Sequence, residues 1–206
     1  MKINIRIQNK GDLTGYLILH PSKDFYKKNK SVMVGAYFKE QLLSNGEIYN
    51  SITDNFQIAG LMESSIKSNI MTTSVTRRLD YHSGTRYLLT NDEIFDFPGP
   101  SYCVRCVAKE NKSIILFCNE RPIYHCDIAS MTECDLPSIS ELMGKWTISY
   151  STTDVIPTYF SPDMPVLTPL WTGHLHMEYN TFELKSSSIT GDMSLSEPDF
   201  HSFCII

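Results

Sequence analysis

Short runs of alternating apolar and polar residues recur along this chain and restrict it to a β-rich fold. Residues 2–8 alternate with period two, and residues 171–184 form the longest such run. This period places the apolar side chains on one face of a half-buried strand. A turn cluster at residues 9–12 (NKGD) leads into residues 13–20, which we expect to be the returning strand of a hairpin.

Further strands are predicted by the same criterion in the second half of the chain, where short polar linkers separate them. We expect helices after Ser31, where Val34, Phe38 and Leu42 recur every fourth residue, and within 61–70 and 135–143. The predicted fold is therefore α+β and β-rich, with antiparallel sheets forming a sandwich or barrel and one or two amphipathic helices near the N-terminal half. The remaining expected strands are 71–79, 85–90, 102–108, 114–119, 123–129 and 145–151.

Domain organisation follows from length and from composition shifts. A chain of 206 residues with 42% hydrophobic residues can bury a sizeable core, and we assign residues 1–185 to a single β-rich domain. The acidic, proline-bounded stretch 91–100 is the candidate sub-boundary. Residues 186–206 are acidic and rich in serine, and we predict a mobile C-terminal tail there.

Charge is distributed unevenly between the two halves of the sequence. Residues 1–90 hold 12 Lys/Arg and 7 Asp/Glu, whereas residues 91–206 hold 6 and 16. If the halves formed separate surfaces, the basic half would attract acidic partners, membranes or the acidic half of a neighbouring copy. If the halves interleave in one fold, the charges average out over the surface.

The densest basic run is the candidate partner-binding surface. Lysines near an anionic surface each contribute on the order of 1 kcal/mol, and interleaved aromatic residues are common at such contacts. The alternative is a solvated loop that precedes a core helix. The residues in question are Lys23, Phe25, Tyr26, Lys27, Lys28 and Lys30.

His174, His176 and Glu178 form the candidate metal site. Residues two apart share a face of a strand, and two imidazoles with a carboxylate can bind a divalent transition metal. The His-X-His element resembles the cupin metal motif, although cupins place their glutamate further along and add a later histidine. The alternative is the solvent face of an antiparallel strand.

The cysteines Cys103, Cys106, Cys118 and Cys126, together with His125, raise the question of a zinc site. A zinc knuckle needs a tight turn that aims both thiolates at one point. Residues 102–107 are predicted to be a strand, which would separate the two cysteines. We therefore expect reduced, buried cysteines that pack as small hydrophobic side chains.

Four short segments resemble the core of rhabdovirus-type matrix proteins in their order: 47–49 (EIY), 58–62 (IAGLM), 81–82 (YH) and 86–88 (RYL). Proteins of that family are typically basic and have a disordered, proline-rich N-terminal arm, and this sequence shows neither feature. The resemblance implies a structural protein that assembles on a membrane or on nucleoprotein.

These observations favour a non-enzymatic interaction or assembly protein. The sequence contains no Gly-X-Ser-X-Gly elbow, P-loop or dinucleotide fingerprint, and we expect no cofactor. The expected partner is a protein, an anionic membrane, nucleoprotein or a second copy in a homo-oligomer. The alternative is a β-barrel or sandwich that binds a small ligand or metal through His174, His176 and Glu178. This alternative includes an enzyme that uses these residues. The N-terminus has no apolar signal-peptide core and no run approaches a membrane span, so we expect a cytoplasmic location.

Overall fold

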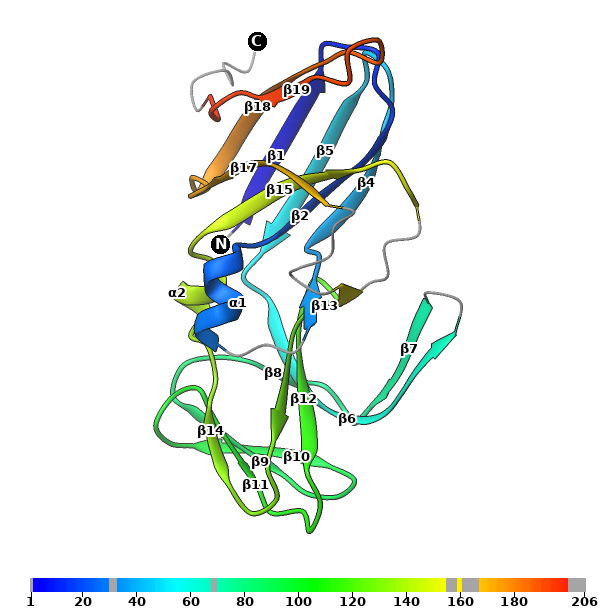
Figure 1. Cartoon of the computed structure of the whole chain (residues 1–206). Helices are drawn as coiled ribbons and strands as arrows, with labels where there is room; N and C mark the ends of the chain where they lie inside the picture. Colours follow the sequence, from blue (N-terminus) through cyan, green and yellow to red (C-terminus); the bar gives the residue numbers. More distant parts are fainter. Residues whose placement is uncertain (1, 30–32, 68–69, 155–158, 161–166, 200–206) are drawn as a thin grey trace.

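Two lobes, each made of two facing sheets, build the molecule (Figure 1). The computed structural model describes residues 2–29, 33–67, 70–154, 159–160 and 167–199. The end lobe consists of sheets A and B and draws on both ends of the chain. The middle lobe consists of sheets C and D and is built mostly from the central part of the sequence. The β-rich α+β fold class predicted from the sequence is thereby confirmed.

Sheets A and B form a sandwich. Ile3, Ile5 and Ile7 point from sheet A into the core, where they belong to the same buried cluster as Leu17 and Ile148 of sheet B. Sheet A has the order β19 (Met193–Leu195), β18 (Glu178–Ser186), β1 (Lys2–Asn9) and β5 (Glu47–Thr53). Sheet B has the order β17 (Thr168–Gly173), β15 (Trp146–Ser151), β2 (Gly15–Pro21) and β4 (Phe38–Leu42).

Sheets C and D face each other in the middle lobe. The Sγ atoms of Cys126 on sheet C and Cys134 on sheet D lie 4.0 Å apart. Sheet C has the order β16 (Tyr159–Phe160), β3 (Met33–Gly35), β13 (Arg121–Ile128), β12 (Lys112–Cys118), β6 (Phe56–Lys67) and β7 (Ile70–Val75), and β8 (Leu79–Asp80) also pairs with β6. Sheet D has the order β10 (Ile94–Pro98), β9 (Thr85–Leu89), β11 (Cys103–Cys106) and β14 (Glu133–Asp135).

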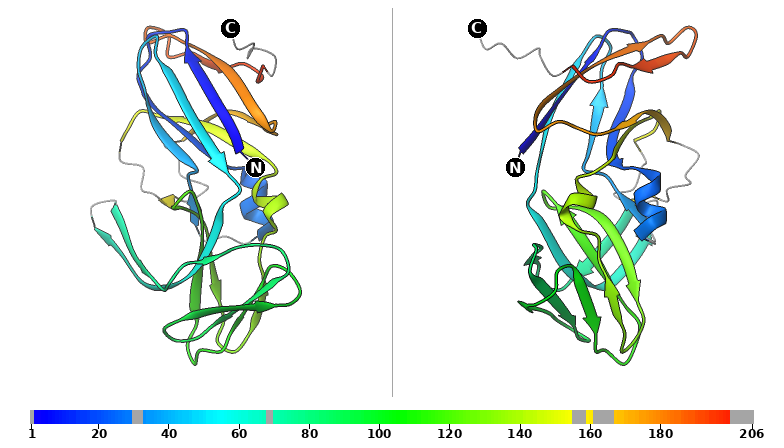
Figure 2. Two further views of the ribbon diagram at one scale, coloured as in Figure 1. Left: turned by 180° about the vertical axis from the view of Figure 1, so that it is seen from behind. Right: turned by 90° about the vertical axis from the view of Figure 1, so that its left-hand side faces the viewer.

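Two short helices lie between the lobes, α1 (Lys23–Asn29) and α2 (Ile139–Leu142) (Figure 2). The Tyr37 ring packs against Trp146 at 4.3 Å between centroids, and its hydroxyl donates to the Leu142 carbonyl at 2.7 Å. Phe25 of α1 packs edge-on against Tyr124 of sheet C at 6.1 Å. These contacts join the cores of the two lobes into one buried cluster.

Every sheet pairs strands from both halves of the sequence. In sheet A, β1 pairs in parallel with β18, and in sheet B, β2 pairs with β15. In the middle lobe, β6 pairs with β12 and β9 pairs with β11. The basic and acidic halves are therefore interleaved, and the sequence asymmetry does not become two oppositely charged ends of the molecule.

Two of the predicted helices are strands in the structure. The segment after Ser31 contains β3 and β4, with residues 30–32 outside the described residues, and residues 61–67 continue strand β6. Residues four apart share a face in a strand as well as in a helix, so the spacing of Phe38 and Leu42 suits β4 equally well. The helix expected within 135–143 is present in shortened form as α2, which begins at a capping box of Ser138 and Glu141.

The two segments singled out as boundary and tail both belong to sheets. Residues 94–98 form β10, which pairs with β9. The predicted tail begins at the last residue of β18, and β19 within it pairs antiparallel with β18. Asp199 adds a bridge to Thr181. The described part of the predicted tail therefore closes the edge of sheet A instead of forming a separate mobile segment.

Candidate functional site

The basic run folds as helix α1, contrary to the expected loop. Phe25 and Tyr26 are 8% and 2% exposed and lie in the core, so they do not contact a partner as predicted. Lys23, Lys27 and Lys28 are exposed on the opposite side. The helix thus uses its aromatic residues to attach to the body and its lysines to face water. Lys30 lies outside the described residues.

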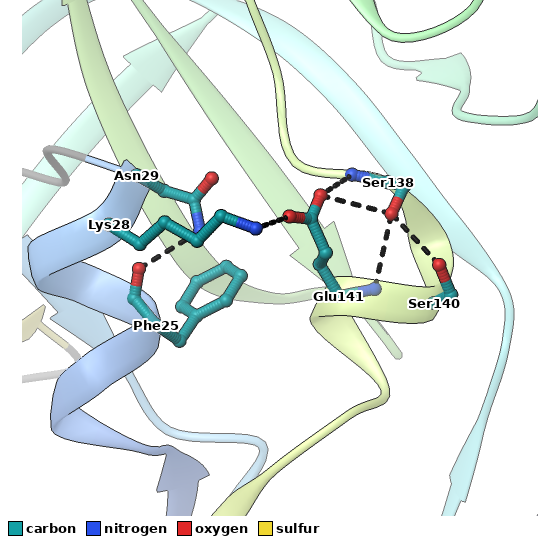
Figure 3. Close-up of polar contacts among 6 residues, drawn as sticks. All are labelled: Phe25, Lys28, Asn29, Ser138, Ser140 and Glu141. Atoms are coloured by element: carbon teal, nitrogen blue, oxygen red, sulfur yellow. Dashed lines mark hydrogen bonds and ion pairs between the residues drawn. The ribbon is translucent and has the colours of Figure 1, made fainter.

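Acidic neighbours offset part of the charge on this lysine face. Lys28 Nζ donates to Glu141 Oε1 of α2 at 2.5 Å, and Glu141 also accepts a hydrogen bond from the Ser138 backbone at 2.8 Å (Figure 3). The hydrogen bond from Lys28 and those from Ser138 lower the pKa of the Glu141 carboxyl. Lys145 Nζ lies 3.9 Å from Asp24 Oδ2. Lys28 therefore contacts α2, and the predicted role of these lysines in partner binding stays a prediction.

His174, His176 and Glu178 do not lie on one strand. His174 and His176 occupy the connection between β17 of sheet B and β18 of sheet A, and Glu178 begins β18 with a φ of 90°. The Asn180 side chain bonds both backbone groups of His176, at 2.8 and 2.9 Å, which fixes the crossover. The His174 ring bonds the Gly144 carbonyl at 2.8 Å. The shared strand face on which this site was predicted is therefore wrong.

The cysteines are located as strand periodicity predicts, in β11, β12 and β13. Cys103, Cys106, Cys118 and Cys126 are buried, and burial raises the pKa of the Cys118 thiol to about 12. No group of three or more His, Cys, Asp or Glu side chains suited to a metal ion occurs among the described residues.

The β6–β7 hairpin is a feature that the sequence did not reveal. Its outer part, residues 62–67 and 70–74, is called the arm here; it extends away from the middle lobe (Figures 1 and 2). Strand β7 is the last strand of sheet C, and its neighbour within the described sheet is β6. The arm therefore presents a strand edge that is open to pairing with another chain.

The base of the arm is held in a defined direction. The pairing of β6 with β7 shifts register between Leu61 and Glu63, a bulge that bends the strand where the arm leaves the sheet. Next to it, Gly60 N donates to Thr76 Oγ1 and Thr76 N donates to the Gly60 carbonyl, both at 2.9 Å. The guanidinium of Arg78 lies 4.0 Å from the centroid of the Phe117 ring.

Leu61 and Val75 anchor the same base by packing on a small second core. This core consists of Ala59, Ile115 and Phe117, which are 0%, 1% and 3% exposed. It lies apart from the main buried cluster. The arm therefore has a packed base and, among the described strands of sheet C, a terminal position at β7.

Another sheet edge, β10 of sheet D, differs from the arm. Phe95 and Phe97 are 45% and 40% exposed there, but Asp96 lies between them and Pro98 ends the strand. Charged residues and proline at an edge disfavour pairing with another strand. The described residues of the arm contain no proline, and their charged side chains are those of Glu63 and Lys67.

Comparisons with protein-family models, with curated proteins and with solved structures found no match. The similarity to rhabdovirus-type matrix proteins therefore stays a prediction from short segments. Within the part of the chain that the structure describes, no helix has both the length and the apolar character needed to cross a membrane.

Proposed function

We propose that this protein is a non-enzymatic assembly protein that associates with a second copy of itself through the β6–β7 arm. The observation that carries the proposal is the projection of the arm, with β7 open at the edge of sheet C. An assembly role is also what the similarity to matrix proteins implies.

A two-stranded ribbon on its own is marginally stable in water, and it gains stability from a third strand or from cover on one face. The arm sequence suits such pairing. It contains Met62, Ile66, Ile70 and Met71, followed by two threonines, and it lacks glycine. The isoleucines and threonines favour strands, and Met62 is half exposed.

A second copy fits this edge because each copy carries the same β7. Two antiparallel β7 strands related by a twofold axis would pair with each other and form one continuous sheet across the dimer. The bulge at Met62 and the bonds between Gly60 and Thr76 fix the arm before contact, which reduces the entropy lost on association.

We place this assembly in the cytoplasm. The five described cysteines carry no disulfide, which agrees with a reducing compartment.

Truncation of the arm tests the proposal. Replacing residues 62–74 by a two-residue Asn-Gly turn keeps the Leu61–Val75 pair at the base and removes the open edge. Light scattering over a concentration series should give a dimer mass for the natural chain and a monomer mass for the truncated one. Circular dichroism checks that the remaining fold is retained.

The matched control is Lys27→Glu combined with Lys28→Glu, which reverses charge on α1 and leaves the arm intact. This variant should dimerise like the natural chain at low and high salt. A monomeric natural chain at every concentration would overturn the proposal. Loss of dimer in the lysine variant with retention in the truncated chain would assign the contact to α1 instead.

A further inference from the structure

The outer face of sheet A carries a pocket of about 440 Å³, far from the arm in the fold. This volume lies within the range of small-molecule binding sites. The pocket spans the strands β18, β1 and β5. Its lining residues are Asn4, Ile5, Arg6, Tyr49, Asn50, Ser51, Tyr179 and Asn180.

Strand register places two tyrosines on either side of a polar centre. Asn4 of β1 lies between Tyr179 of β18 and Ser51 of β5, and the next outward residue, Arg6, lies beside Tyr49. Tyr49 is 61% exposed and Tyr179 is 40% exposed. The Arg6 guanidinium lies 5.4 Å from the centroid of the Tyr49 ring. Two partly exposed aromatic rings at the sides of one pocket are typical of a surface that stacks on a ligand.

The charge of Arg6, the charged residue in the pocket lining, is compensated by Glu47 beside the pocket. Arg6 Nη2 donates to Glu47 Oε1 at 2.7 Å, and the Tyr49 hydroxyl donates to the other carboxylate oxygen. Hydrogen bonds from Tyr49 and Arg6 lower the pKa of Glu47 to about 2, so the carboxylate stays ionised at neutral pH. The ion pair leaves no net charge to select an anionic or cationic ligand.

The remaining polar groups supply both donors and acceptors. The Asn4 amide nitrogen donates to the Glu178 carbonyl at 2.8 Å, and no described residue donates to its amide oxygen. The Ser51 hydroxyl makes no hydrogen bond within the described part of the chain, and it can donate or accept. A ligand that fits this set must itself carry several hydroxyl groups near an apolar ring face.

We propose that this pocket binds a neutral sugar, a pyranose unit of a mono- or oligosaccharide. The C–H face of the ring would stack on Tyr49 or Tyr179, and its hydroxyls would bond Asn4, Ser51 and the Arg6–Glu47 pair. A purely apolar ligand would leave these polar groups without partners, which costs binding energy. A strongly anionic ligand would be repelled by the carboxylate of Glu47, and a strongly cationic ligand by the guanidinium of Arg6.

The test uses the full chain and a panel of neutral, sialylated and sulfated oligosaccharides, with glucose and N-acetylglucosamine oligomers as the main neutral probes. Binding of a neutral probe, measured by calorimetry, should be at least tenfold weaker in Tyr49→Ala and in Tyr179→Ala. Tyr49→Phe keeps the ring and should bind within a few-fold of the natural chain. Both tyrosines are exposed, so the variants should retain the fold, which thermal unfolding verifies.

Phe95→Ala removes an equally exposed aromatic side chain from β10 in the other lobe and serves as the control. It should leave the affinity unchanged, as should truncation of the arm. The proposal is overturned if no neutral probe binds at millimolar concentration, or if both tyrosine variants bind like the natural chain. Binding restricted to anionic probes and abolished by salt would also contradict it.

Discussion

The two lobes differ in how the chain builds them and in the surface that each presents. The end lobe joins strands from opposite ends of the chain, such as β1 with β18, and its accessible feature is a polar sheet face with a pocket. The middle lobe uses mostly contiguous strands and presents an open edge at β7. A side-chain surface and a main-chain edge recognise different kinds of partner, so the two proposed contacts are separable within one protein.

The largest expected effects test whether the two lobes unfold as one unit. Trp146 is fully buried in the end lobe and packs on Tyr37. Trp146→Ala should therefore lower the free energy of unfolding by about 3–5 kcal/mol. Tyr87 is equally buried in the middle lobe, stacks on Tyr81 at 5.7 Å and donates to the Asp80 carbonyl, so Tyr87→Ala should cost a similar amount.

Fluorescence distinguishes the lobes because Trp146 and Trp171, the two tryptophans of the chain, are both in the end lobe. Since one buried cluster spans both lobes, Tyr87→Ala should shift the fluorescence transition in urea as much as the circular dichroism transition. An unchanged fluorescence midpoint in this variant would show that the lobes unfold independently.

A pH effect is expected in the end lobe, at His20. The His20 ring donates from Nδ1 to the Pro21 carbonyl at 2.8 Å and accepts from the Ser149 hydroxyl at Nε2. Burial lowers the pKa of His20 to about 4, whereas an unfolded histidine has a pKa near 6.5. The unfolded state therefore binds the proton first, and stability should fall by up to about 3 kcal/mol from pH 6.5 to pH 4. Urea midpoints across this window should show a shallower pH slope in His20→Gln; an unaltered slope would exclude His20 as the cause.

Asn9 should matter more than an exposed asparagine of the middle lobe. Its amide nitrogen donates to the carbonyls of Leu13 and Leu43, and its oxygen accepts from Gly11 N and the Ser186 hydroxyl. Asn9→Ala leaves these groups without their partner and should lower the free energy of unfolding by about 2 kcal/mol. Asn111→Ala, which removes one bond to Ser130 N, should cost less than about 1 kcal/mol. Equal shifts in the urea midpoint would contradict this difference.

The smallest effects are expected at the junction between the lobes. Ser138→Ala removes the capping box of α2 and should cost about 1 kcal/mol. Lys28→Ala removes an exposed ion pair with Glu141 and should cost no more than about 0.5 kcal/mol. Thermal unfolding of both variants gives the ranking, and the reverse order would mean that the α1–α2 ion pair contributes more than the cap.

Local patterns predicted the fold class and many of the strands, including β1, β2 and β15, because alternation reports which face of a strand is buried. The four-residue spacing of Phe38 and Leu42 led to a wrong prediction of a helix, because this spacing places two residues on one face of a strand as well as of a helix. The prediction that His174, His176 and Glu178 share one strand face was wrong for a different reason. A crossover between sheets, fixed by Asn180, interrupts a run that looks continuous in the sequence.

The arm and the sheet A pocket depend on pairings that a single sequence does not contain. Tyr49 and Tyr179 are 130 positions apart in the sequence and flank one pocket because β1 lies between their strands. The arm is defined by the absence of a further strand beside β7 in the described sheet, which local composition does not encode. The aromatic residues of the basic run were misassigned because a short helix buries them and leaves the lysines in water.

The parallel pairing of β1 with β18 also means that sheet A is completed late during synthesis of the chain. Asn9 and Glu178 belong to adjacent strands, and at ribosomal speeds of roughly 5–20 residues per second the second strand follows the first after roughly 10–30 s. During that interval β5 can pair with one edge of β1, and the edge that later pairs with β18 stays unpaired. A nascent chain therefore exposes an unpaired edge for seconds, and release of residues 178–186 from the ribosome determines when sheet A closes.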